Sequence, residues 1–185
     1  MLSILQTQKL THFFNILDQD KNGMLQIQDF EQVGQNVCSS LCLKVDTSAY
    51  DEIINKCRSM FHNLITSVAH NNHDFISPNA WLTYFDLEVI TSQNRQTLND
   101  FINLTIDNLF EIYDQNGDGE ICLDEYIDMF TVYGITASQT AKSFPKLDTD
   151  GNETISKEEL QQAMKDFFVS DDPLAKGNWV FGMWN

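Results

Sequence analysis

Basic residues are scarce in this chain of 185 residues, which has 11 Lys and Arg against 27 Asp and Glu. The formal net charge of -16 argues against nucleic acid or an anionic membrane surface as a partner, because phosphate contacts require a positive face. Proline and glycine are also few, at 3 and 8 residues. This scarcity leaves long stretches with the periodicity of a helix.

Long apolar runs are missing as well, and none approaches the roughly 18–20 residues that span a bilayer. The first ten residues turn polar almost at once, so we read no secretory signal and expect a cytoplasmic protein. The four cysteines form no Cys-x-x-Cys pair and complete no zinc spacing. We interpret them as free thiols in a reducing compartment: Cys38, Cys42, Cys57 and Cys122.

Apolar and aromatic residues are plentiful, with a hydrophobic fraction of 42% and 13 Phe, which rules out a disordered acidic chain. They recur at helical spacing, as in Leu10, Phe13, Phe14 and Leu17. Ser77-Pro78 is typical of a helix start. Strand-like alternation is limited to very short apolar points inside loops. The pattern predicts an all-α class.

Three acidic, glycine-punctuated loops lie between the expected helices, at residues 18–29, 114–125 and 148–159. Each loop places oxygen side chains at positions 1, 3 and 5, an apolar residue at position 8 and a carboxylate at position 12. Ca²⁺ takes six to eight oxygen ligands, and this spacing is that of the EF-hand, a helix, a twelve-residue loop and a second helix. The apolar eighth residues are expected to pair between loops in short β-bridges.

The loop positions define the candidate metal ligands. Position 7 contributes its backbone carbonyl, and the other positions contribute side chains. The first loop supplies Asp18, Asp20, Asn22, Met24 and Asp29. The next complete loop supplies Asp114, Asn116, Asp118, Glu120 and Glu125. The last loop supplies Asp148, Asp150, Asn152, Thr154 and Glu159.

The three loops differ in ways that affect ion binding. Asp29 closes the first loop and is one methylene shorter than Glu, so it favours one bound oxygen and greater tolerance of Mg²⁺. Glu153 stands at position 6 of the last loop, where a left-handed backbone is needed and glycine is usual. We therefore expect Ca²⁺ at three sites, with Mg²⁺ possible at the first, and we expect the last loop to be the weaker of the two C-terminal sites.

A fourth loop is needed to pair with the first, and aligning Ile76 with position 8 places it at residues 69–80. Alanine occupies its positions 1 and 12, so this loop is predicted to bind no Ca²⁺ and to support the first site by pairing Ile76 with Leu25. His70 and His73 lie in this loop, and we interpret them as exposed rather than metal-binding.

Four EF-hands with a degenerate second loop resemble the sarcoplasmic calcium-binding protein, calexcitin and calerythrin family. The resemblance rests on sites at Asp18, Asp114 and Asp148, on Asp29 closing the first loop, and on the tail from Asp166 onward. It implies two pairs of EF-hands in a compact two-lobed fold that buffers Ca²⁺. The coelenterazine photoproteins share the site pattern, but no histidine follows His73 here.

The expected domains are an N-terminal EF-hand pair at 1–93, a C-terminal pair at 94–170, and an apolar tail at 171–185 folded over the cleft between lobes. No catalytic motif is visible, so the chain is not expected to be an enzyme. The predicted function is a monomeric buffer of Ca²⁺ and partly of Mg²⁺. A sensor whose tail is displaced by a protein target and a carrier of a luciferin-type small ligand are the alternatives.

Overall fold

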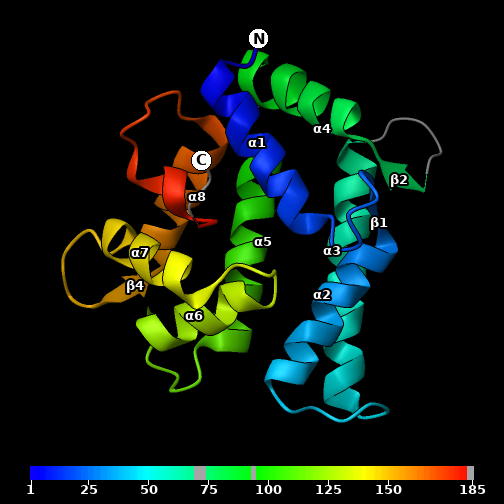
Figure 1. The fold of residues 1–185 in the computed structure, drawn as a ribbon, viewed down its shortest axis with the longest axis vertical. Helices are drawn as coiled ribbons and strands as arrows, with labels where there is room; N and C mark the ends of the chain where they lie inside the picture. Colours follow the sequence, from blue (N-terminus) through cyan, green and yellow to red (C-terminus); the bar gives the residue numbers. More distant parts are fainter. Residues whose placement is uncertain (69–73, 93–94, 183–185) are drawn as a thin grey trace. The chain divides into compact units, whose positions relative to one another are not determined.

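A computed structural model describes residues 1–68, 74–92 and 95–182 (Figure 1). Within these ranges the secondary structure is helical apart from strands of two or three residues, so the all-α prediction is confirmed. The residues form two compact units. One unit is Thr11–Tyr84, and the other joins Met1–Leu10 to the described residues that follow Tyr84.

The unit formed by Thr11–Tyr84 holds the first two helix pairs around one apolar core. The rings of Phe13 and Phe14 lie 6.0 and 6.1 Å from Trp81, and Phe30 lies 5.3 Å from Phe61. Its elements are α1 (Ile4–Leu17, which begins in the other unit), β1 (Leu25–Gln26), α2 (Ile27–Ser40), α3 (Ser48–Val68), β2 (Phe75–Ile76) and α4 (Pro78–Tyr84).

The expected helix start at Ser77-Pro78 is confirmed, because the Ser77 hydroxyl accepts the Ala80 amide at 3.2 Å. β1 and β2 are antiparallel and place Leu25 opposite Ile76, both with no exposed surface. This register confirms the alignment of the degenerate second loop. Residues 69–73 of that loop, including both histidines, lie outside the described residues.

The second unit contains the helix pairs that flank the two C-terminal loops. Its strands pair Ile121 with Ile155, which are both fully buried. The rings of Phe167 and Phe168 lie at its core, 5.4 Å apart. Its elements are η1 (Phe85–Thr91), α5 (Gln96–Tyr113), β3 (Glu120–Cys122), α6 (Leu123–Thr131), α7 (Ala137–Leu147), β4 (Thr154–Ser156), α8 (Lys157–Val169) and η2 (Lys176–Trp179).

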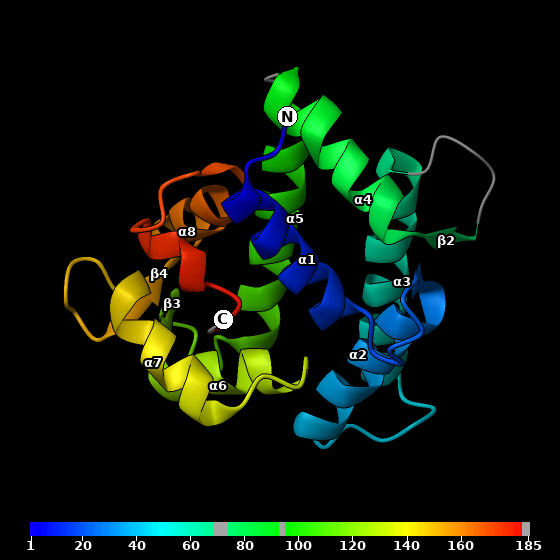
Figure 2. The same ribbon diagram turned by 45° about the horizontal axis from the view of Figure 1, so that its top comes forward.

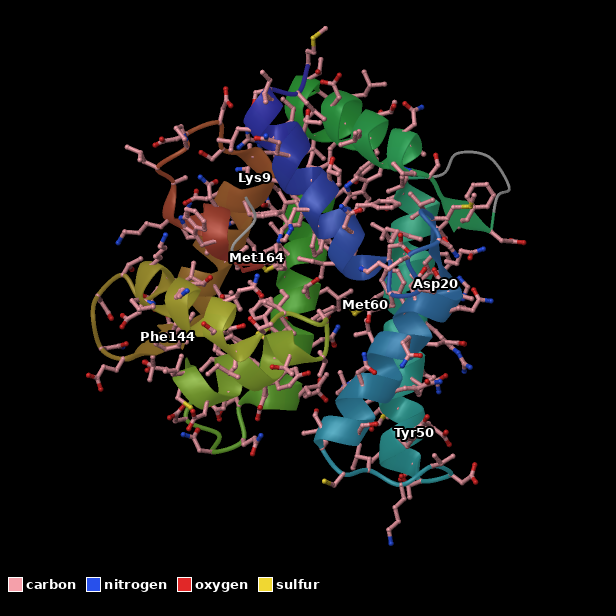
Figure 3. All side chains as sticks on the ribbon, in the orientation of Figure 1. Lys9, Asp20, Tyr50, Met60, Phe144 and Met164 are labelled. Carbon is pink, nitrogen blue, oxygen red and sulfur yellow. The ribbon has the colours of Figure 1, made fainter. Side chains whose placement is uncertain are left out.

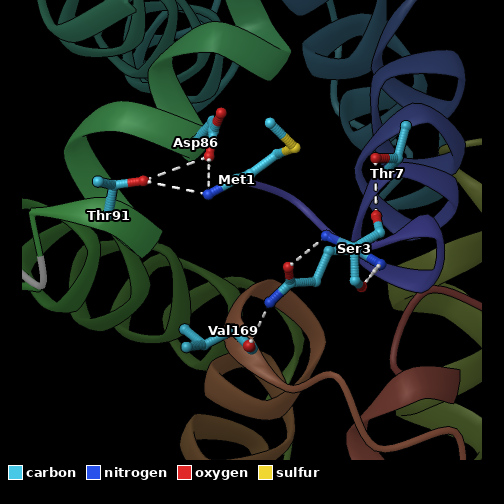
Figure 4. Close-up of polar contacts among 7 residues, drawn as sticks. Met1, Ser3, Thr7, Asp86, Thr91 and Val169 are labelled. Carbon is cyan, nitrogen blue, oxygen red and sulfur yellow. Dashed lines mark hydrogen bonds and ion pairs between the residues drawn. The ribbon is translucent and has the colours of Figure 1, made fainter.

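The N-terminal residues are held by polar contacts within this second unit (Figure 4). The Met1 ammonium lies 2.8 Å from a carboxylate oxygen of Asp86, and the Gln6 side-chain amide donates to the Val169 carbonyl at 2.8 Å. These contacts explain why residues 1–10 pack with the C-terminal hands. The compact units therefore differ from the expected domains at 1–93 and 94–170. Those two ranges are based on which loops form a pair, and they stay a prediction.

The helix expected around residues 81–90 changes its winding in the middle. α4 is an α-helix, and η1 follows it as a π-helix, in which the Ser92 amide donates to the Leu87 carbonyl at 3.0 Å. Phe85 and Val89 on η1 are buried, so the wider turn still presents apolar side chains to the core. Among the described residues, no helix is both long and apolar enough to cross a membrane.

Candidate metal sites

The first loop brings its oxygen side chains together through its own backbone amides. Asp18 follows the end of α1, and its Oδ2 accepts the Gly23 amide at 2.9 Å. Asp20 Oδ1 accepts the Asn22 amide at 3.0 Å, and Asn22 Oδ1 in turn accepts the Met24 amide at 2.8 Å. Carboxylate oxygens of Asp18, Asp20 and Asp29 all lie within 4.8 Å of one another. This loop therefore gathers hard oxygen donors around one point.

One buried carboxylate oxygen in this loop indicates that a cation would fit here. Asp18 is only 4% exposed, and its Oδ1 is buried with no hydrogen-bond partner. A buried carboxylate oxygen that lacks a partner is costly, whereas a bound cation would satisfy it. Since Asp20 and Asp29 supply further oxygens at the same point, the donor set matches a hard divalent ion such as Ca²⁺ or Mg²⁺.

The loop between α5 and α6 has a similar set of internal hydrogen bonds, with one more to its first residue. Asp114 Oδ1 accepts the Gly117 amide at 2.8 Å, and its Oδ2 accepts the Gly119 amide at 3.0 Å. Asn116 Oδ1 accepts the Asp118 amide at 2.9 Å, and Asp118 Oδ1 accepts the Glu120 amide at 2.9 Å. The side chains at positions 1, 3 and 5 are therefore oriented by the loop backbone.

The loop between α7 and α8 gathers Asp148, Asp150 and Glu159, whose carboxylate oxygens lie within 4.8 Å of one another. Glu159 accepts the Thr149 amide at 2.7 Å and the Ser156 amide at 3.0 Å, and both hydroxyls also donate to it. Partial burial raises the pKa of Glu159, but these four hydrogen bonds outweigh it and lower the pKa to about 2. The closing carboxylate is therefore held in its ionised form.

The carboxylate at position 12 has the same structural role in all three loops. It accepts the amide of position 2 with one oxygen and the amide of position 9 with the other, at 2.7–3.0 Å. It is also the third residue of the exiting helix and completes a capping box there. The residues in this position are Asp29, Glu125 and Glu159. The shorter Asp29 reaches the same amides as the two glutamates.

The turn of each loop uses two left-handed residues, at positions 4 and 6. Gly117 and Gly119 have φ of 72° and 82°. Glu153 has φ of 67°, so it adopts the left-handed conformation that was expected at position 6. Lys21, at position 4 of the first loop, has φ of 59°, which sequence reasoning did not anticipate.

The residues at position 7 lie on or next to the short strands. Met24 precedes β1, whereas Glu120 and Thr154 begin β3 and β4. The Thr154 hydroxyl contacts a carboxylate oxygen of Glu120, so these two side chains link the paired loops. The sequence pattern predicted a role only for the backbone carbonyls of these two residues, as metal ligands, and gave no sign of a contact between their side chains.

Sequence reasoning also missed a buried cation near the chain ends, Lys9 on α1 (Figure 3). Lys9 has no exposed surface, and its ammonium donates to the carbonyls of Asp166 and Ser170 at 3.0 and 2.8 Å and to Asn178 Oδ1 at 2.9 Å. Burial lowers the pKa of Lys9 to about 8, although the charges of Asp166 and Asp171 oppose the shift. Its position in the apolar stripe, four residues before Phe13, was the available signal.

Comparison with known proteins places the loops in context. The EF-hand family model matches residues 106–130 and 141–165, which contain the two C-terminal loops. The chain is 23% identical over 167 residues to calerythrin of Saccharopolyspora erythraea, covering 90% of this chain and 94% of that protein. It is 28% identical over 173 residues to mitrocomin of Mitrocoma cellularia, covering 90% of this chain and 83% of that protein.

The solved structures give the same fold. The structure of a sarcoplasmic calcium-binding protein from amphioxus matches with a TM-score of 0.72 and 16% identity, covering 100% of both chains. The predicted resemblance to the calerythrin and sarcoplasmic calcium-binding protein family is therefore confirmed.

Proposed function

We propose that this chain, which has the EF-hand fold and resembles calerythrin and the sarcoplasmic calcium-binding proteins, binds Ca²⁺ at three loops and acts as a cytoplasmic buffer. The observation that carries the proposal is the buried, unpartnered Oδ1 of Asp18 beside the carboxylates of Asp20 and Asp29. An ion there would compensate the burial of this charge. The C-terminal loops have a similar hydrogen-bonded framework, in which both oxygens of the first residue accept loop amides.

The proposed ligands are the side chains at positions 1, 3, 5 and 12 and the carbonyl at position 7 of each loop. The side chain at position 12 would close the coordination shell, because the capping box already holds it over the loop. Asp29 would bind Mg²⁺ more readily than a glutamate would, because a shorter arm favours a six-coordinate ion. The bound ions would supply charge neutralisation only, and no enzymatic step is part of this proposal.

The burial of two methionine side chains favours a buffer over a sensor. Sensors of this kind expose a methionine-rich groove when they are loaded. Here Met129 and Met164 are 0% and 1% exposed and belong to the buried core of the C-terminal unit. The rings of Phe130 and Phe167 in the same unit are also buried, and both pack against Phe181.

Calorimetric titration with Ca²⁺, with and without Mg²⁺, tests this function. We expect three bound ions in the native chain, with Mg²⁺ competing most strongly at the first loop. Asp29→Glu should raise the preference of that loop for Ca²⁺, because the longer arm can bind through both oxygens. Glu125→Asp is the reverse change in the loop at residues 114–125, and it should lower the preference of that loop for Ca²⁺ over Mg²⁺. Fewer than three ions in the native chain would contradict the proposal, and unchanged affinity ratios in both variants would contradict the role given to Asp29.

A further inference from the structure

The C-terminal segment 171–182, called the tail below, packs against α6, α7 and α8 within one unit (Figure 2). The tail approaches α8 closely at Gly177 in η2. A Cβ at that position would lie 2.1 Å from the Ala163 carbonyl oxygen and 2.6 Å from the Asp166 Cβ. Only glycine therefore allows the tail to lie directly on the backbone of α8.

Beyond Gly177, the tail inserts its side chains among the helices. Val180 has no exposed surface, and its carbonyl accepts the Tyr126 hydroxyl at 3.1 Å. The Phe181 ring lies 4.8 Å from that of Phe167 on α8 and 6.0 Å from that of Phe130 on α6. The end of the tail is therefore part of the buried core of this unit.

The tail also contacts the chain on both sides of the last loop. The Lys146 ammonium lies 3.6 Å from the centre of the Trp179 ring, and Lys146 is only two residues before the first ligand of that loop, Asp148. On the other side, Gly177 rests on α8, whose third residue is the closing Glu159. The two helices that flank this loop, α7 and α8, are thus both in contact with η2.

Buried Lys9 connects the tail to the C-terminal end of α8. It joins the last turn of α8 to Asn178 of the tail, and the Asn178 amide in turn donates to the Asp172 carbonyl at 2.9 Å. The carbonyls at a helix C-terminus attract a cation, which explains why an ammonium is tolerated at this buried position. The tail is therefore held through hydrogen bonds as well as through aromatic packing.

We propose that the docked tail holds α7 and α8 in the arrangement that binds an ion at the last loop, so that tail docking and Ca²⁺ binding at residues 148–159 strengthen each other. This inference rests on the proposed function of that loop. The docked tail coexists with carboxylates already gathered within 4.8 Å, so docking and the ion favour the same arrangement. Coupling between two such sites is reciprocal.

Undocking variants of the full-length chain test the first direction of the coupling. Gly177→Val should expel the tail by steric conflict with Ala163, and Trp179→Ala removes a tail contact without adding bulk. Each should weaken Ca²⁺ binding at the last loop by about tenfold in calorimetry, within the usual range of coupling, and leave the first loop unchanged. Leu174→Ala, at a tail residue that is 86% exposed, is the matched control and should bind as the native chain does.

Limited trypsin digestion tests the reverse direction. Ca²⁺ should slow cleavage after Lys176 in the native chain, and it should lose this effect in Glu159→Gln, which lacks the closing carboxylate. If the native chain binds no ion at residues 148–159, the proposed function of that loop fails. If it binds there, but the undocking variants bind equally tightly or more tightly, only the coupling is wrong. Circular dichroism checks folding, and Trp179→Ala decides the result should Gly177→Val fail to fold.

Discussion

Single residues decide how the three loops differ, although their hydrogen-bonded frameworks are alike. Asp18 has a buried oxygen with no partner, whereas both oxygens of Asp114 accept loop amides. Glu159 is held by two hydroxyls that Glu125 lacks, because its loop has Thr149 and Ser156 where the other has Gln115 and Cys122. Equal spacing of ligands therefore does not imply equal affinity.

Glu153→Gly should tighten Ca²⁺ binding at the last loop. The left-handed φ of 67° at this residue costs about 1 kcal/mol for a side chain with a Cβ, and glycine removes that cost. Up to about fivefold tighter binding is expected, and calorimetry of the variant measures it. Lys21→Gly, at a φ of 59° in the first loop, is the matched change and should act only there. Weaker binding in Glu153→Gly would mean that the turn is not what limits this site.

At the scale of elements, the two-residue strands β1 and β2 connect the complete first loop with the degenerate second loop. β2 comes from the degenerate loop, yet Ile76 is as buried as Ile155, its counterpart in the last loop. A loop that has lost its ligands can therefore still hold its partner through the eighth residue. The capping boxes at α2, α6 and α8 act in a similar way, since each makes one carboxylate part of both helix and loop.

Ile76→Ala should destabilise the unit formed by residues 11–84 and weaken the first metal site without changing a ligand. Removing a fully buried isoleucine costs about 2–5 kcal/mol of unfolding free energy. Denaturant unfolding measures the stability, and calcium titration measures the site. Phe75→Ala changes the other residue of β2, which is partly exposed, and should have the smaller effect on both. A variant that loses stability but keeps native affinity at residues 18–29 would argue against the supporting role of the second loop.

At the scale of the whole molecule, charge and ion binding are coupled. Three bound Ca²⁺ carry a charge of +6 and would change the formal charge from -16 to -10. Less negative charge means less self-repulsion in the folded state, and an ion that binds only the folded state stabilises it further. We therefore expect bound ions to stabilise this chain more than they would stabilise a chain with balanced charges.

Removing Ca²⁺ with a chelator should lower the melting midpoint, and added salt should recover part of the loss by screening the negative charges. Thermal unfolding followed by circular dichroism measures both effects. A hydrophobic dye in the same samples separates a buffer from a sensor, since a buffer exposes little new apolar surface on loading. Identical melting with and without Ca²⁺ would refute the charge argument, and strong dye binding only in the loaded form would indicate a sensor.

The sequence by itself determined the helical class, the positions of the three complete loops, and the pairing of Leu25 with Ile76. These features are readable because they depend on residues close together in the chain. A loop ligand is set by its place within twelve residues, and a helix by apolar residues three and four apart. The roles of the individual ligands remain predictions that ion titration will test.

Only the tertiary structure decided where Lys9 and the tail belong. Lys9 and Asn178 are 169 residues apart in sequence, and neither has a local pattern that predicts the other. The same holds for Gly177, whose need for glycine arises from the backbone of α8. Packing between distant segments depends on the folded shape of both surfaces. The spacing of residues along the chain therefore does not predict such contacts.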